Sequence, residues 1–204
     1  MEKRRLAVII ALALATSVRA QTRFTKDFSA DLVSEAGGHQ TTSRFYASKN
    51  RTRSEILRKG TVIGVMLIDY GSHTGWNLRP QAKIATDMSA VMKSGLASMN
   101  KDVLTGAPPD PNNPCAALRS YTCRKLGSED VNGRHTQKWE MKDTSNGQVM
   151  TVWIDPSLPL AVRTQWNGGG AEYRNIKEGP QPDSLFQVPS DYKKVPSLFG
   201  REQH

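Results

Sequence analysis

Residues 51–70 read RTRSEILRKGTVIGVMLIDY, and this stretch decides the fold class. Two strand-like runs, 51–57 and 61–70, flank the turn-forming pair Lys59-Gly60. This pattern is typical of an antiparallel β-hairpin. The second run is apolar on both faces, with Ile63, Val65 and Leu67 on one and Val62, Met66 and Ile68 on the other. We therefore expect other parts of the chain to cover this strand from both sides.

Seven further strands are predicted on both sides of the hairpin. Strand-like runs, most of them alternating, occupy residues 28–32, 41–48, 76–78, 135–141, 149–154, 160–166 and 172–177. In the first of these, Phe28, Ala30 and Leu32 fall on one face of the strand, and Ser29 and Asp31 on the other. The count predicts eight or nine strands, largely antiparallel, in an open or partly closed sheet. With one helical insertion near 86–123, the fold class is α+β.

The insertion is recognised by a change of period. From Asp87 to Lys101, apolar side chains recur at helical spacing, at Met88, Val91, Met92, Leu96 and Met99. Asp87 is placed to cap this helix. Two interpretations stay open, because methionine adapts to irregular apolar partners: an ordinary core helix, or a deformable lid over an apolar cavity. Residues 102–114 hold four prolines and predict a long irregular loop.

The first twenty residues have the three parts of a secretory signal peptide. Lys3, Arg4 and Arg5 precede an apolar run, and short side chains stand before a cut after Ala20. We therefore expect an exported, periplasmic protein whose mature part, residues 21–204, is one domain. Removal of residues 1–20 takes four of the 28 basic residues and one of the 19 acidic ones, leaving a formal charge of +6. That balance favours anionic partners.

The two cysteines, Cys115 and Cys123, are expected to form a disulfide in an oxidising compartment. Eight residues of continuous helix would separate their Cα atoms by about 12 Å, whereas a disulfide tolerates roughly 4–7 Å. The chain must therefore turn back between them. Two thiols without a nearby histidine make an incomplete zinc site, so no metal is expected.

Catalytic motifs are missing from the sequence. It has no Gly-x-Ser-x-Gly elbow, no His-Glu-x-x-His pair, no phosphate-binding glycine loop and no dinucleotide fingerprint. The four histidines stand apart from cysteines and from paired acidic residues. We therefore expect no enzyme activity and no cofactor, although carboxylate pairs leave no spacing signature. No nucleic-acid-binding pattern is present either.

Basic residues gather around the hairpin of residues 51–70, at Lys49, Arg51, Arg53, Arg58 and Lys59. They are either the solvated side of two strands or a functional cluster. In the second interpretation, Arg53 and Glu55 share a strand face, where an inward-pointing pair would gate a cavity or meet an anionic head group.

Short motifs recur in a recognisable order through most of the mature chain. They are Lys49-x-Arg51-x-Arg53-x-Glu55, Ile68-Asp69-Tyr70, Trp76-x-Leu78-x-Pro80-x-x-Lys83, Gly127-x-Glu129-x-Val131-Asn132-Gly133, Lys138-Trp139, Val152-Trp153-Ile154-Asp155 and Asp183-Ser184-Leu185-Phe186-x-Val188-Pro189. In this order they resemble the periplasmic LolA/LolB-like superfamily of lipoprotein carriers. The resemblance implies a half-open antiparallel barrel around a helical lid, with an apolar cavity for acyl chains. It also implies an arginine at the cavity, for which Arg53 is the nearest match and Arg51 the alternative.

Together, these observations predict a non-enzymatic, monomeric binding protein for a lipid or the acyl chain of a lipoprotein. The expected cavity is lined by Met66, Trp139 and Trp153, with Arg53 at its side, and is covered by Met88, Val91, Met92, Leu96 and Met99. The alternative is an envelope sensor domain that binds a protein partner, and an exported enzyme of another type comes third.

Overall fold

The computed structural model describes residues 24–92, 110–116, 118, 120–158 and 160–196. The strands are β1 (Phe28–Ala36), β2 (His39–Ser48), β3 (Arg51–Arg58), β4 (Thr61–Asp69), β5 (Thr74–Arg79), β6 (Ile84–Asp87), β7 (Tyr121–Val131), β8 (Arg134–Asp143), β9 (Val149–Asp155), β10 (Leu160–Trp166), β11 (Gly169–Glu178) and β12 (Lys193–Val195). Two 3-10 turns, η1 (Pro80–Ala82) and η2 (Asp183–Phe186), complete the elements of this part of the chain. The proposed signal segment, 1–20, lies outside the described residues.

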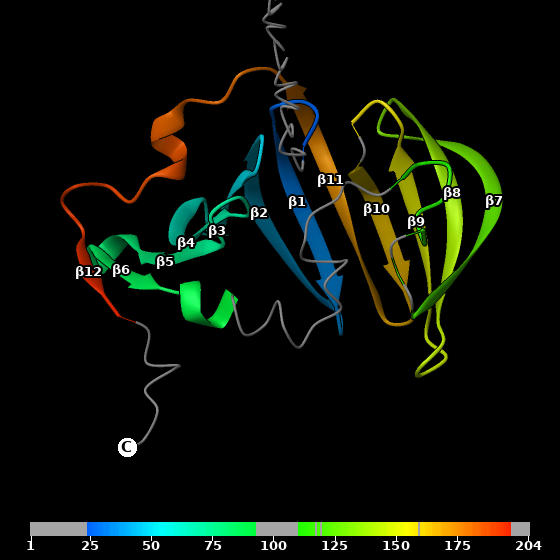
Figure 1. Ribbon diagram of the computed structural model, residues 1–204, viewed down its shortest axis with the longest axis horizontal. Coiled ribbons are helices and arrows are strands. Elements are labelled where there is room, and N and C mark those ends of the chain that lie inside the picture. Colours follow the sequence, from blue (N-terminus) through cyan, green and yellow to red (C-terminus); the bar gives the residue numbers. More distant parts are fainter. Residues whose placement is uncertain (1–23, 93–109, 117, 119, 159, 197–204) are drawn as a thin grey trace, which may run out of the picture.

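All twelve strands belong to one open sheet, in the order β12-β6-β5-β4-β3-β2-β1-β11-β10-β9-β8-β7. Figure 1 shows it as a curved sheet with β12 and β7 on opposite sides of the view. Neighbouring strands are antiparallel, except that β12 runs parallel to β6. The chain builds one half by successive hairpins from β1 to β6 and the other from β7 to β11. The pairing of β1 with β11 joins the halves.

The predicted count of eight or nine strands was too low. The three strands missing from the prediction are β6, β7 and β12. β7 reads YTCRKLGSEDV, which is mostly polar and has no apolar alternation, because it is the last strand of the sheet and is exposed along most of its length. β12 is three residues long and forms only by pairing with β6.

Two hairpin turns show why particular residues connect the strands. Lys59 and Gly60 between β3 and β4 have φ of 50° and 78°, and Asn132 and Gly133 between β7 and β8 have φ of 51° and 76°. Two consecutive residues at positive φ match the right-handed twist of flanking strands, and glycine and asparagine adopt this conformation at the least cost. The predicted hairpin of residues 51–70 is therefore confirmed.

Strand register divides the side chains between two faces, which we name after residues of the central strand β1. The Phe28 face carries Phe28, Ala30 and Leu32, and the Asp31 face carries Ser29 and Asp31, as alternation predicted. Cross-strand partners lie on the same face of a sheet, so the pairing carries both faces across all twelve strands.

The C-terminal segment covers the Asp31 face over β4, β5 and β6. In Figure 1 the orange segment leaves the upper end of β11, passes through η2 at the upper left and descends to β12 at the left of the view. Val188 and Tyr192 from this segment pack on a buried cluster of Val65, Leu67, Leu78 and Ala85. We expected other parts of the chain to cover both sides of β4. On the Asp31 face, residues far away in the sequence provide this cover.

Ion pairs fasten the same segment at two places. Arg51 donates to Asp183 at 2.6 Å and lies over the ring of Phe186, and Lys83 meets Asp191 at 2.9 Å. Hydrogen bonds from these cations lower the pKa of both aspartates.

The helical insertion differs from the expected lid. Its described part contains four helical residues, 89–92, and turns at 111–112 and 114–116. Asp87 accepts a hydrogen bond from the Ser89 N–H at 2.8 Å, as a capping residue does. Leu96 and Met99 lie outside the described residues, so the remainder of the predicted stripe stays a prediction. The turns at 111–112 and 114–116 have a physical cause in Pro111 and Pro114 and in the disulfide, which brings the chain back on itself.

The disulfide Cys115–Cys123 is confirmed, with a Cα–Cα distance of 5.8 Å. Cys123 lies on β7, and Cys115 lies in the turns before it, so the bridge fastens the end of the insertion to the last strand.

Replacing both cysteines by serine should lower the free energy of unfolding by about 2–3 kcal/mol, because the unfolded chain regains loop entropy. Urea unfolding of the oxidised protein and of the double variant measures the difference. Thiol counting on denatured, unreduced protein should find no free thiol, and two free thiols would contradict the bridge.

Candidate functional site: an apolar face of the open sheet

The centre of the Phe28 face is an aromatic cluster built on β1 and β2. Phe24, Phe28, Ala30 and Ala47 are buried together with Leu158, which comes from the turn between β9 and β10. Tyr173 on β11 and Phe45 extend the cluster, with ring centroids 5.4 Å apart and edge-on packing. Aromatic pairs in this geometry stabilise beyond the area that they bury.

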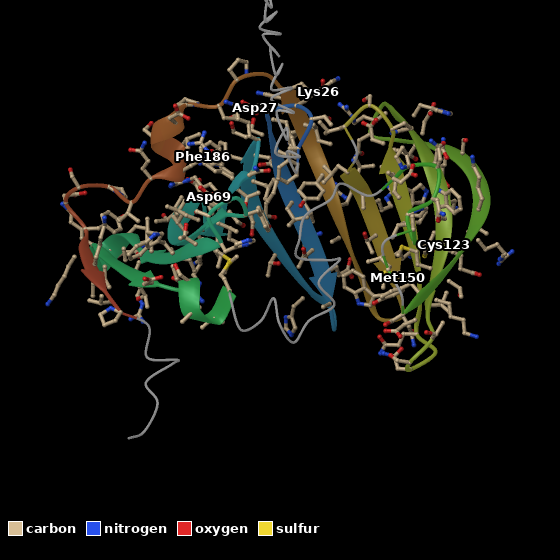
Figure 2. All side chains as sticks on the ribbon, viewed as in Figure 1. Lys26, Asp27, Asp69, Cys123, Met150 and Phe186 are labelled. Carbon is tan, nitrogen blue, oxygen red and sulfur yellow. A yellow bond between two sulfur atoms is a disulfide. The ribbon has the colours of Figure 1, made fainter. Side chains whose placement is uncertain are left out.

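A second apolar cluster on the same face covers β8 and β9. Trp139, Met141, Val152 and Ile154 are buried there beneath the disulfide and the turns that precede β7. The indole N–H of Trp139 donates to the Pro111 carbonyl at 3.2 Å, so its one polar atom is satisfied. In Figure 2, Cys123 and Met150 mark this end of the sheet, far from Asp69 and Phe186.

Three large apolar side chains on the Phe28 face remain exposed. Ile56 on β3, Met66 on β4 and Trp166 on β10 keep 50%, 43% and 40% of their surface accessible. Their register places each of them on the side that carries the two buried clusters. Large apolar side chains that stay exposed on one face make that face a candidate for an interaction site.

The start of the insertion contacts this same face. Gly75 on β5 pairs with Ile68, and a Cβ added to Gly75 would lie 3.0 Å from the Met92 sulfur. A glycine at this position therefore lets Met92 rest against the strand. Met88, Val91 and Met92 are all half-buried.

The structure separates the residues that the sequence grouped into one cavity. Met66 and Trp139 share the Phe28 face, but Trp153 and Arg53 lie on the Asp31 face. The reason is register: Trp153 pairs with Lys138, next to the pair of Trp139 with Val152, and neighbouring positions point to opposite faces.

The environments of those two residues fit this placement. The Trp153 indole donates to Glu129 at 3.1 Å and lies beneath the Lys138 ammonium. Arg53 donates to Glu55 at 2.7 Å and to the Leu185 carbonyl at 3.0 Å, beneath the C-terminal segment. Arg53 and Glu55 do form the predicted pair, on the face away from the aromatic cluster.

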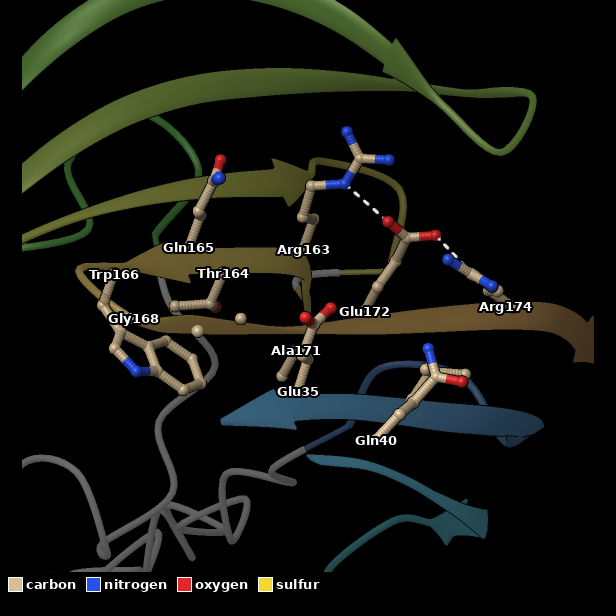
Figure 3. Close-up of a pocket in the computed structure, with 13 residues that line it drawn as sticks. Glu35, Gln40, Arg163, Thr164, Gln165, Trp166, Gly168, Ala171, Glu172 and Arg174 are labelled. Carbon is tan, nitrogen blue, oxygen red and sulfur yellow. Dashed lines mark hydrogen bonds and ion pairs between the residues drawn. The ribbon is translucent and has the colours of Figure 1, made fainter. Parts of the chain in front are cut away.

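The Asp31 face also carries an ionic network around Glu172. This carboxylate accepts hydrogen bonds from Arg163 at 2.6 Å and Arg174 at 2.7 Å (Figure 3). It also accepts one from Asn132 at 3.0 Å. Burial alone would raise the pKa of Glu172, but the hydrogen bonds from Asn132, Arg174 and Arg163 outweigh it and lower the pKa from 4.5 to about 2. Asn132 belongs to the β7–β8 turn, so the network holds that turn against β11.

A polar depression of about 470 Å³ lies at the end of the β10–β11 hairpin (Figure 3). Gly169 is part of its lining. A residue with a side chain would not fit at this position, because its Cβ would stand 2.3 Å from the Glu35 carbonyl oxygen. Trp166 packs against Gly169 from the Phe28 face, while Arg163, Gln165 and Glu172 belong to the Asp31 face. This depression is too polar to hold an apolar ligand.

Neither a metal site nor a membrane-spanning helix is found in the part of the chain that the structure describes. Within it, no group of three or more histidine, cysteine or acidic side chains is placed to hold a metal ion. Among the same residues, no helix has the length and apolar character needed to cross a membrane.

Sequence reasoning missed part of the Phe28 face. Ile56, Val152 and Trp166 were not recognised as part of the surface that carries Met66 and Trp139. Their strands had been found, so the missing information was the register that aligns the strands. In the sequence, Trp166 alternates with the polar neighbour Gln165. This alternation shows that the two side chains point to opposite faces of β10, but it does not show which of them points to the Phe28 face.

Comparisons with known proteins concern the fold. No protein-family profile matches this chain, and no curated protein matches its sequence. An uncharacterized conserved protein from Thermus thermophilus is similar in structure, with a TM-score of 0.55 and 13% identity over 86% of this chain and 93% of the other. The MucA/MucB complex of Pseudomonas aeruginosa contains a chain that matches with a TM-score of 0.54 and 15% identity, over 85% of this chain and 59% of that one.

A weaker match is a LolA superfamily protein from Nitrosomonas europaea, with a TM-score of 0.35 and 11% identity over 79% of this chain and 90% of the other. The two matches with TM-scores above 0.5 show the fold alone, an open and mainly antiparallel β-sheet.

Proposed function

We propose that this protein is an exported, non-enzymatic binding protein for an apolar ligand, either a lipid or the acyl chain of a lipoprotein. The ligand would bind on the Phe28 face. The observation that carries this proposal is the exposure of Ile56, Met66 and Trp166 on the face of the sheet that also carries two buried apolar clusters.

The chemistry of this surface suits an acyl chain. Each CH₂ group removed from water contributes about 0.8 kcal/mol, so an acyl chain needs no specific polar contact to bind. Methionine and tryptophan supply large, adaptable apolar surfaces. The signal-like segment and the disulfide support an oxidising compartment, for which we propose the periplasm.

Met66 forms the sheet side of the proposed site, and Trp139 belongs to a buried cluster on the same face. Met88, Val91 and Met92 form the side of the insertion, and we propose that Leu96 and Met99 continue it. Trp153 and Arg53 are left out of this site because they lie on the Asp31 face.

Changing Met66 to glutamate should weaken binding of a fluorescent fatty-acid probe by at least about tenfold, since a charge on the binding surface opposes burial of the chain. The melting temperature should change little, because 43% of the surface of Met66 is already exposed to solvent. Probe titration and a thermal melt measure the two effects.

Val149→Glu is the matched control. Val149 is 45% exposed, but it pairs with Lys142 and so lies on the Asp31 face. It should bind the probe as the wild type does. Equal loss in both variants, or a wild type that binds no probe, would contradict the proposal.

A protein partner is the second candidate, because a similar chain occurs in the MucA/MucB complex. The same apolar face would then receive a segment of an envelope protein. Lipid in an organic extract of the protein purified from its native host favours the first candidate. One specific protein that co-purifies with the wild type but not with Met66→Glu favours the second.

A further inference from the structure

An irregularity in the sheet lies between the two central strands β1 and β11. Register shifts there, so that Ser29 pairs with Lys177 while Asp31 pairs with Arg174. The extra residues bulge: Asn175 has a positive φ of 52°, and its amide donates to Asp31 at 2.7 Å. Bulges re-aim side chains and are over-represented next to functional sites.

The bulge accompanies an open depression of about 390 Å³, separate from the Phe28-face site. Its lining consists of Ser29, Ala30, Asp31, Arg44, Tyr46, Asn175, Ile176 and Lys177. Register places the side chains of Arg44, Tyr46 and Lys177 on the Asp31 face around β1. Donor groups therefore approach the depression from both neighbouring strands, β2 and β11.

Positive charge exceeds negative charge around this depression. Each of two carboxylates is shared by two arginines. Glu55 lies 2.7 Å from Arg53 and 3.8 Å from Arg44, and Glu172 is held by Arg163 and Arg174.

The third carboxylate, Asp31, accepts from Asn175. Among the described residues, no hydrogen bond or ion pair engages the Lys177 ammonium or the Tyr46 hydroxyl. Five cationic groups thus face three carboxylates, and an ammonium and a hydroxyl lie ready to donate.

We propose that this depression binds a phosphate group, as an ester or as the free ion. Phosphate offers several strong acceptor oxygens, so Arg44, Lys177 and Tyr46 can donate to it at once from two strands. Its charge offsets the excess of cations on this face. The site is on the opposite side of the sheet from the apolar face and does not depend on the function proposed for that face.

The test measures phosphate binding to the exported protein at constant ionic strength, by calorimetric titration with inorganic phosphate. A second arm measures sedimentation with phosphatidylcholine vesicles, with and without phosphatidylglycerol. Lys177→Ala should weaken binding by about tenfold, the usual effect of losing one charge-assisted hydrogen bond. Lys142→Ala is the control, because Lys142 is an exposed lysine on β8 of the same face.

The arms identify the source of the phosphate. Binding of the free ion that Lys177→Ala weakens supports a soluble phosphate, and vesicle binding with the same dependence supports a lipid head group. Absence of binding in both arms overturns the proposal, and so does an equal loss in Lys177→Ala and Lys142→Ala. Met66→Glu should bind phosphate as the wild type does, so failure of the apolar site would be seen separately.

Discussion

Replacing Glu172 by glutamine should lower the free energy of unfolding at pH 7 by up to about 3 kcal/mol. This figure follows from the fall in the pKa of Glu172 from 4.5 to about 2, at about 1.4 kcal/mol for each pKa unit. The physical source is the set of hydrogen bonds from Arg163, Arg174 and Asn132, which hold the ionised carboxylate. Glutamine keeps the shape but loses the charge and leaves two guanidinium groups beside each other.

The pH dependence of this effect has a defined sign. The folded-state pKa lies below the unfolded one, so the contribution is fully present above about pH 4.5 and is lost as the pH falls toward 2. The difference in stability between the wild type and Glu172→Gln should therefore be largest near neutral pH and shrink between pH 5 and pH 2. Urea unfolding at pH 7, 5 and 3 measures it.

Glu140→Gln serves as the control for this experiment. Glu140 also meets an arginine, Arg124, at 3.0 Å and 3.1 Å, but 69% of the arginine side chain is exposed. Surface pairs of this kind contribute about 0–1 kcal/mol, so the control should lose little. If Glu172→Gln is no less stable than the control, or if its deficit is the same at pH 7 and pH 3, the network does not stabilise the fold as argued.

The second large effect is expected from Met92→Glu. If the insertion is a lid over the apolar face, this change should reduce binding of the fatty-acid probe by at least about tenfold while most of the stability remains. We expect this result because Met92 is half-buried and rests on Gly75 at the sheet surface. In a true core, an unpaired carboxylate would cost several kcal/mol, a large share of the roughly 5–15 kcal/mol that stabilise a domain.

Probe titration and thermal melts on the wild type and the variant separate the two roles. Ala90→Glu is the control, because it adds the same charge in the same helical turn at an exposed position. It should leave the probe titration and the thermal melt as they are in the wild type. A Met92→Glu protein that unfolds assigns the residue to the core. A variant that binds the probe normally removes Met92 from the site.

Local chemistry in the sequence determined the strands that alternate and the turns between them. Lys59-Gly60 predicted the β3–β4 turn, and Phe28, Ala30 and Leu32 predicted the face that β1 buries. The disulfide was predictable because the sequence has two cysteines, eight residues apart, and is expected to reach an oxidising compartment. The resemblance to LolA-like proteins predicted an open antiparallel sheet, which the structure contains.

Tertiary structure alone decided which strands are neighbours and what each face meets. β7 and β12 were missed because their pairing, and not their composition, makes them strands. Trp139 and Trp153 were grouped by residue type, yet the register of β8 and β9 sends them to opposite faces. A one-residue change of register reverses every side chain of a strand, and no short-range pattern specifies the register between β1 and β11, which meet across about 140 residues. The sequence therefore predicted that an apolar surface exists. Only the pairing of distant strands decided which side chains share that surface.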